Sequence, residues 1–381
     1  MLGRSFALVW LYSLLTTFAW AALFPVLPLY VRGPLDGGDV AVGVVMSGAP
    51  LLAGIVQPLL GRFADRRGRR LLLIGGPLIF GTCILLFSVV DSVGGLLALR
   101  IAAGIGDSAF IVGAVTVVND LAPEGRRGEA YSIFSLSTWA GMGLGPLIGD
   151  LVLHTISFDA VWITCAAVSA AAVVTAALLP ETRPAVPRER VRSALFNRAA
   201  LLPGLVLVCE IFGFAALLAF MPLYAKELGM QGAGLVLLVN AAVLVAVRVF
   251  ARRLPDRLGP RRSATAGVAI SAVGLALPAV LVQPAGLFLG AALFGAGHAL
   301  SYPALLMLAV SRAREDESSA AVGSLKACEA LGQAAGGVLL GVVAAASGYG
   351  AVFALAGIAT ALGLIPLRAL APDRRPVSLV R

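Results

Sequence analysis

Residues 61–70 read GRFADRRGRR, and this stretch places five arginines and one aspartate in ten positions. The surrounding chain has 381 residues, of which 59% are hydrophobic and only 13% are charged. A soluble surface has to be covered with polar groups, so this composition excludes an ordinary soluble protein. Apolar runs of about 18 or more residues recur along the chain, which is typical of membrane-spanning helices. The arginine-rich stretch is therefore interpreted as a polar loop between two spans.

Apolar runs of roughly 20 residues, broken by charge, proline and glycine, predict about twelve spans. The hydrophobic start, from Phe6 to Tyr30, is too long for the apolar core of a secretory signal and is interpreted as the first span. The predicted spans lie near 5–30, 40–60, 70–90, 94–119, 129–153, 159–180, 200–225, 232–252, 263–282, 285–311, 319–346 and 348–370.

The loops alternate in charge, and this alternation predicts the orientation of the chain. Arginines crowd into 62–70, 126–127, 183–198, 252–262 and 312–314, whereas the opposite loops hold little more than Arg32 and Lys226. Positive loops stay on the cytoplasmic side, so both termini and the linker 181–199 are expected there. The same rule accounts for the net charge of +9 without a nucleic-acid partner. The linker divides the chain into two six-helix halves, residues 1–180 and 200–381.

The two halves match each other at a constant offset of 191 residues. ADRRGRR at 64–70 matches PDRLGPRR at 255–262, and GIGD at 104–107 matches GAGH at 295–298. Gly141 and Gly145 match Gly332 and Gly336 at the same offset. A constant offset across three pairs of helices indicates duplication. In duplicated membrane folds of this kind the substrate site lies near the midplane between the halves.

At this point the chain resembles, over its whole length, transporters of the major facilitator superfamily. GRFADRRGRR resembles that family's loop motif G-x-x-x-D-[RK]-x-G-[RK]-[RK], and LRIAAGIG at 99–106 resembles its fourth-span motif R-x-x-x-G-x-G. GMGLGPLIGD at 141–150 resembles the fifth-span antiporter motif G-x-x-x-G-P-x-x-G-G, with Asp150 in place of the last glycine. LFPVLPLY at 23–30 is similar to the first-span end of drug and sugar efflux members. The resemblance implies an all-α membrane protein with twelve transmembrane helices in two pseudo-symmetric six-helix bundles.

The resemblance also implies a cytoplasmic gate built on the loop motif, with Gly61 and Gly68 as its glycines. Asp65 is expected to meet the cytoplasmic end of a helix in the other half, near Ser318 and Ser319, which are plausible N-caps of the eleventh span. A carboxylate at a helix N-terminus is favourable by about 0.3–1 kcal/mol. By the same resemblance Asp120 can pair with Arg69. The alternative is that the loop only anchors the topology.

Ionisable residues within spans are functional candidates by default, because a charge at mid-bilayer costs about 2.5–3.5 kcal/mol. Asp107 in the fourth span and His298 in the tenth stand at repeat-related positions, and Asp107 is the first choice for a group that couples transport to protons. His298 is the second candidate, and its alternative role is a buried imidazole bonded to a backbone carbonyl. Glu210 in the seventh span is either another proton site, a contact for a cationic substrate, or a protonated residue in a packed interface.

Helix spacing gives two further predictions. Arg100 lies about 10 Å before Asp107 on the same helix face, too far for direct contact. The resemblance implies that it aids proton coupling; a structural clamp on helix-end carbonyls is the alternative. Lys326 and Glu329 are spaced i, i+3 and are expected to pair with each other, unless Lys326 serves as an anion site.

The fifth-span motif, with Gly141, Gly145, Pro146 and Gly149, predicts a small-residue face for tight helix packing. We expect that face to pack against the eighth span, in the other half. The resemblance implies that this contact limits leak through the closed transporter. Asp150 is expected near the outer end of the span, where water reaches it.

The function predicted from these features is proton-coupled efflux of small amphipathic or drug-like molecules by alternating access, by a protein expected to act as a monomer. The alternative is an importer or facilitator of a metabolite such as a sugar or an organic acid, although such proteins usually have a more polar cavity. An enzyme is not expected, because the chain shows no G-x-S-x-G, phosphate loop or soluble domain. The four cysteines, Cys83, Cys165, Cys209 and Cys328, lie far apart in apolar runs, so neither a metal nor another cofactor is expected.

Overall fold

The architecture is described from a computed structural model of the chain. It describes residues 3–122, 127–182, 197–251, 254, 258–314 and 317–370. Within these ranges, the side chains of seven helical residues are not described: Gly54, Pro58, Asp65, Arg127, Gly128, Ser318 and Ser319.

The described residues form helices joined by short turns and contain no strand, as the sequence predicts. Along the first half of the chain, the helices are α1 (Arg4–Ala21), α2 (Leu23–Arg32), α3 (Asp39–Arg67), α4 (Arg70–Leu85), α5 (Val93–Leu121), α6 (Arg127–Thr155) and α7 (Phe158–Ala177). The 3-10 turn η1 (Leu86–Val89) follows α4. In the second half they are η2 (Arg198–Ala200), α8 (Leu201–Ala219), α9 (Met221–Glu227), α10 (Gly234–Phe250), α12 (Pro260–Val280), α13 (Pro284–Val310), α14 (Ser318–Leu362) and α15 (Leu364–Ala369).

Three details of the helices explain how they correspond to the predicted spans. α1 and α2 make one span of 29 residues, and Pro25 lacks the N–H that would bond Ala21 one turn back. α14 combines two predicted spans, because Gly348 interrupts it with a φ of 78° that is easy only for glycine. By length and composition, ten of the described helices can cross a membrane, and Gly234–Phe250 is a shorter apolar helix of the same kind.

The chain divides by its internal contacts into two compact units. Unit one comprises residues 1–189 together with 218–241, and unit two comprises residues 190–217 together with 242–381. The division differs from a single cut in the linker, because the segment 218–241, with α9 and the start of α10, packs with the first unit.

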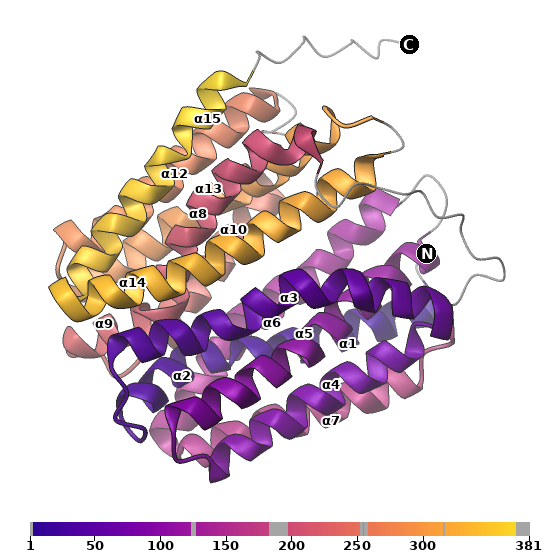
Figure 1. Ribbon diagram of the computed structural model, residues 1–381, viewed down its shortest axis with the longest axis horizontal. Helices are drawn as coiled ribbons and strands as arrows, with labels where there is room; N and C mark the ends of the chain where they lie inside the picture. The colour runs from indigo at the N-terminus through magenta and orange to yellow at the C-terminus, as the bar shows by residue number, and fades with distance from the viewer. Residues whose placement is uncertain are drawn as a thin grey trace. The chain divides into compact units, whose positions relative to one another are not determined.

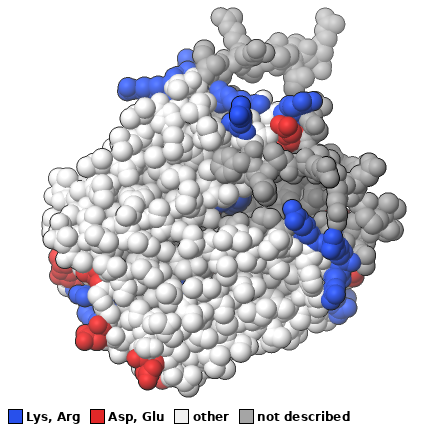
Figure 2. Space-filling view, in the orientation of Figure 1, with Lys and Arg blue, Asp and Glu red and all other residues white. Residues whose placement is uncertain are grey.

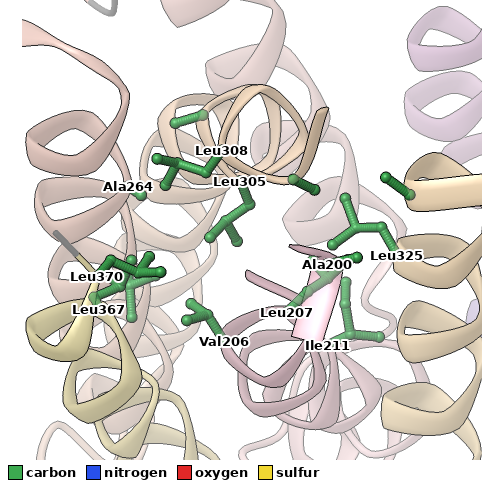
Figure 3. Packing of buried hydrophobic residues seen from close by; sticks show 14 residues of the cluster. Ala200, Val206, Leu207, Ile211, Ala264, Leu305, Leu308, Leu325, Leu367 and Leu370 are labelled. Carbon is green, nitrogen blue, oxygen red and sulfur yellow. The ribbon is translucent and has the colours of Figure 1, made fainter. Parts of the chain in front are cut away.

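In unit one, α4 lies between α5 and α7, and α1 packs against α5, α6 and α7 (Figure 1). In unit two, α12 takes the corresponding place and packs against both α13 and α14. A cluster of buried aliphatic side chains holds this second unit together, with Val206 and Leu207 of α8 close to Leu305 of α13 and Leu325 of α14 (Figure 3).

The duplication seen in the sequence recurs in the contacts within each unit. α4 and α5 cross at Gly76 and Gly106, where a Cβ on either glycine would press against backbone of the other helix. α12 and α13 cross in the same way at Gly267 and Gly297, 191 residues later. Because each crossing brings backbone against backbone, only glycine fits there.

A second pair of contacts repeats at the same offset. The Arg70 guanidinium donates to the carbonyl of Ala177 at 2.6 Å, and the Arg261 guanidinium donates to the carbonyl of Arg368 at 3.1 Å. In each unit an arginine at the start of one helix therefore binds the carbonyl end of that unit's last span, where the helix leaves acceptors unpaired.

The surface agrees with a lipid environment. Large aliphatic residues such as Leu51, Ile55 and Val280 are more than half exposed, which water would disfavour and lipid does not. On the face shown in Figure 2 broad areas carry no charged side chain.

Candidate functional site

Glu210 of α8 is completely buried and forms the centre of a polar cluster within unit two. Its Oε1 atom accepts hydrogen bonds from Ser301 Oγ at 2.6 Å and Ser271 Oγ at 3.0 Å. His298 Nδ1 lies 3.2 Å from the same oxygen. The other carboxylate oxygen, Oε2, has no hydrogen-bond partner among the described residues. Three helices, α8, α12 and α13, therefore bring their polar groups onto one oxygen atom.

Aromatic rings surround the imidazole of His298. Phe214 and Phe294 stack with it at centroid distances of 5.9 and 5.6 Å, and Tyr302 lies 5.5 Å away in a tilted arrangement. The negative face of an aromatic ring attracts a cation, so this environment suits an imidazolium as well as a neutral ring. The imidazole of His298 therefore contacts a carboxylate as well as these rings.

Lys326 and Glu329 form the predicted ion pair, with Nζ and Oε2 2.8 Å apart. The structure adds Tyr302, whose hydroxyl donates to the same Oε2 at 3.2 Å and whose ring lies 5.2 Å below the Lys326 ammonium. Their side chains are 50% and 30% exposed, so these charges reach beyond the protein interior. Glu329 is thus connected to His298 through the Tyr302 ring.

Asp107 stands on α5, fourteen residues after its start, as His298 does on α13. Its Oδ1 atom has no hydrogen-bond partner in the described part of the chain, and the Trp20 side chain lies within hydrogen-bonding reach of the carboxyl group. Arg100 is 1% exposed, and its Nε and Nη1 atoms also have no partner among described residues. Arg100 acts on Asp107 through its charge without a direct ion pair, as the spacing predicts.

The loop after α3 forms a compact charge cluster in unit one. Arg69 is buried, and its Nε donates to Asp120 Oδ2 at 3.1 Å, which confirms the predicted pair. The backbone N–H groups of Arg69 and Arg70 donate to the two oxygens of Glu181 at 2.9 and 3.2 Å. Glu181 therefore sits at the N-terminus of α4, where the helix dipole favours an anion. Gly68, with a φ of 100°, lies directly against this carboxylate.

Part of the predicted gate lies outside the described residues, namely the side chains of Asp65, Ser318 and Ser319. The residue preceding α14 is Glu317, so Ser318 and Ser319 belong to the first turn of this helix. Gly61 has open space around it, so it marks no close helix contact.

The glycines of the fifth-span motif pack against the first span, not against the eighth as predicted. A Cβ at Gly141, Gly145 or Gly149 would press on backbone of residues 14–22. Gly143, on the adjacent face, contacts Leu238 and Ala241 of α10, and the carbonyl of Pro146 faces Gly234. The predicted contact with the eighth span is therefore made by the residues between the motif glycines, because a helix turns its neighbouring positions to different faces.

Asp150 lies near the end of α6, and 14% of its side chain is exposed, so water reaches it in part. Its Oδ2 accepts the N–H of Gly234, the first residue of α10, at 3.0 Å. His154, one turn further along α6, lies 3.5 Å from Oδ1. A Cβ at Gly232 would overlap the carboxylate, so Gly232 is needed to admit Asp150.

The sequence did not single out Ser271, Ser301, Tyr302 or Glu181. Serines and tyrosines are common in spans, and nothing in their spacing distinguishes these from others. Glu181 belongs to a stretch that reads as linker. The repeat could have drawn attention to Ser271 and Ser301, because they stand at the positions of Phe80 and Phe110 in the first half.

The fold and the site together define a multi-pass membrane protein with ionisable groups buried in its spans. A model of the Major Facilitator Superfamily matches residues 9–262 and 204–380. The chain therefore belongs to this superfamily of membrane transporters.

Several relatives match over nearly the whole chain. An MFS-type transporter of Salmonella typhimurium (strain LT2) is 28% identical over 350 residues, which cover 88% of this chain and 89% of the relative. The multidrug resistance proteins MdtG of Yersinia enterocolitica and Serratia proteamaculans are 26% and 27% identical, each covering 93% of this chain and 90% of the relative.

Solved structures share the fold at low identity. The nucleoside transporter NupG superposes with a TM-score of 0.78 at 16% identity, covering 96% of this chain and 99% of that one. The human organic anion transporter MFSD10 superposes with a TM-score of 0.73 at 18% identity, covering the same shares.

Proposed function

We propose that this protein is a proton-coupled exporter of small amphipathic or drug-like molecules that works by alternating access. It acts as a monomer in the cell membrane, with both termini and the linker 181–199 on the cytoplasmic side. The linker joins two homologous six-helix halves, residues 1–180 and 200–381. Protons and a small-molecule substrate are its partners.

The observation that carries the proposal is a pair of buried ionisable groups at repeat-related positions, Asp107 in α5 and His298 in α13. A lone carboxylate within a span is costly, and Asp107 has an oxygen without a hydrogen-bond partner in the described structure. Protonation removes that cost. A cationic substrate and a proton compete for the same carboxylate, and this competition supplies the exchange.

The direction of transport is supported by the relatives. Two of them are named multidrug resistance proteins and match 93% of this chain. The fifth-span glycines support exchange rather than facilitated diffusion, because Gly141, Gly145 and Gly149 allow α6 to lie directly on the backbone of the first span. Tight packing between α6 and the first span limits leak through the closed transporter.

The loop cluster is proposed as the cytoplasmic gate. Arg69 and Asp120 form a buried ion pair at the end of α5, and Gly68 gives the loop its turn. Asp65 and Gly61 belong to the same motif. In this proposal the cluster helps to stabilise one of the two transport states, so neutralising Asp120 changes the rate of transport without changing its dependence on the proton gradient.

The experiment that tests the function uses inverted membrane vesicles containing the protein and ethidium as the transported dye. Acidification of the vesicle lumen should drive dye accumulation, and an uncoupler should abolish it. Asp107→Asn should remove the response to the pH gradient, because the amide cannot exchange a proton. Asp91→Asn changes an exposed carboxyl between η1 and α5 and serves as the matched control.

Two results would contradict the proposal. Undiminished, uncoupler-sensitive accumulation by the Asp107→Asn variant would remove Asp107 from the mechanism. Dye accumulation that ignores the pH gradient in the unchanged protein would remove proton coupling itself.

A further inference from the structure

Two buried serines converge on the carboxylate of Glu210. Ser271 on α12 and Ser301 on α13 are both 0% exposed, and both hydroxyls donate to Oε1 at 3.0 and 2.6 Å. His298 Nδ1 approaches the same oxygen at 3.2 Å, whereas Oε2 has no partner among described residues. A carboxylate only accepts hydrogen bonds, so this arrangement fits an anion that receives three donors on one oxygen.

The first half of the chain shows that the helix crossing does not require these serines. The crossing glycines Gly76 and Gly106 recur as Gly267 and Gly297, with matching backbone neighbours. At the positions of Ser271 and Ser301, however, the first half carries Phe80 and Phe110, whose rings meet edge to face at 6.4 Å. The same crossing thus accepts two phenyl rings or two hydroxyls.

The two serine hydroxyls are present only in the half of the chain that also has the Glu210 carboxylate. The residue 191 positions before Glu210 is Ala19, which offers nothing for a hydroxyl to bind. In that half the position of His298 is occupied by Asp107, whose Oδ1 atom has no hydrogen-bond partner in the described ranges. The serine pair is therefore explained by the chemistry of Glu210 and not by helix packing.

We propose that Ser271 and Ser301 are positioning residues that hold Glu210 as a carboxylate against His298, so that His298 carries the proton exchanged in the second half. Nδ1–H of the imidazole remains donated to Glu210 Oε1, and the exchanged proton binds to and leaves from Nε2. The neutral imidazole is then the Nδ1–H tautomer. The assignment of this proton to transport rests on the proposed function, whereas the geometry of the pair does not.

Among the described residues, Tyr302 links the pair to further charged side chains. Its ring contacts His298, and its hydroxyl and ring contact Glu329 and Lys326 of α14. Arg248 of α10 lies near Tyr302. Glu329 and Lys326 neutralise each other at 2.8 Å, so the cluster beyond Tyr302 leaves Glu210 as the anion in contact with the imidazole.

The test is ¹⁵N solid-state NMR of the histidine-labelled protein in lipid, which distinguishes the imidazolium and the two neutral tautomers. The chain has only two histidines, so His154→Gln leaves His298 as a single signal. Spectra across a pH series are compared for this background and for Ser301→Ala, Ser271→Ala and the double variant. Ser263→Ala is the matched control, because this buried serine of α12 donates to the Leu300 carbonyl and not to Glu210.

We expect the Nδ1–H tautomer in the background protein at high pH. In the doubly protonated pair, loss of each hydroxyl should favour transfer of the Nδ1 proton from the imidazolium to the carboxylate, which gives a carboxylic acid that donates to Nδ1 of an Nε2–H imidazole. Because a hydrogen bond to a charged group is stronger than a neutral one, the ratio of imidazolium to Nε2–H imidazole should change about tenfold for each serine. Ser301→Thr keeps a hydroxyl and should restore the background spectrum, and Ser263→Ala should not differ from it.

Superimposable titration curves for the serine variants and the background would overturn the inference, as would an Nε2–H tautomer in the background protein. Each variant is first shown to be monodisperse, so a misfolded protein is not mistaken for a shifted equilibrium. The readout needs no transport. Serine-dependent spectra together with dye transport that ignores the pH gradient would refute the proposed function and leave the positioning role intact.

Discussion

Gly75 and Gly76 are neighbours in α4 but have opposite surroundings, and this contrast gives a stringent test of the helix crossing. A Cβ at Gly75 would meet nothing within 4 Å. A Cβ at Gly76 would lie 2.7 Å from the backbone nitrogen of Phe110 and 2.9 Å from the carbonyl oxygen of Gly106. Both of these atoms belong to the backbone of α5, so no side-chain rotation relieves the overlap.

The expected magnitudes follow from these distances. Gly75→Ala gains helix propensity and should stabilise the protein by up to about 1 kcal/mol. Gly76→Ala gains the same propensity, but α4 and α5 have to separate, and over-packing typically costs about 1–3 kcal/mol. The two variants should therefore differ by about 2 kcal/mol in the free energy of unfolding. The repeat agrees with this expectation, because the second half carries Ala266 and Gly267 at the equivalent positions.

The assay is SDS-induced unfolding of the purified protein, followed by tryptophan fluorescence or circular dichroism. Gly75→Ala acts as the size-matched control for Gly76→Ala, since both add one methyl group to the same helix. Equal effects of the two substitutions, or a Gly76→Ala protein as stable as the unchanged one, would refute the close approach of α4 and α5.

Two other contacts make predictions of the same kind. Gly232→Ala should destabilise the protein by about 1–3 kcal/mol because its methyl group overlaps the Asp150 carboxylate, and adding Asp150→Gly should remove most of that effect in a double-mutant cycle of unfolding free energies. Arg69→Ala should cost about 3 kcal/mol because it leaves the largely buried Asp120 without its cation, and Asp120→Ala in the same protein should recover part of the loss; purely additive effects in the same unfolding assay would show that the pair does not interact.

Local patterns predicted much of the fold. Hydropathy located the spans because a helix must be apolar over about 20 residues to cross lipid, whatever its neighbours are. The constant offset located the duplication, and the i, i+3 spacing predicted the pair of Lys326 and Glu329. These features depend on residues close together in the chain, or on two copies of the same pattern.

The candidate site was only partly predictable, because its residues are far apart in the chain. Glu210 was recognised as a costly buried charge, but its partners come from 61, 88 and 91 residues away, on helices whose rotation no local pattern specifies. The helix that packs against the motif glycines was predicted wrongly. A row of glycines indicates that another helix packs closely, but it does not indicate which helix this is.

The sequence by itself determined that this is a duplicated, polytopic membrane protein with ionisable residues in its spans, since insertion into lipid selects on composition and on loop charge. Only the tertiary structure decided which of those residues meet. Hydrogen bonds to Glu210 form over distances near 3 Å, and the relative rotation of three packed helices determines which atoms come that close.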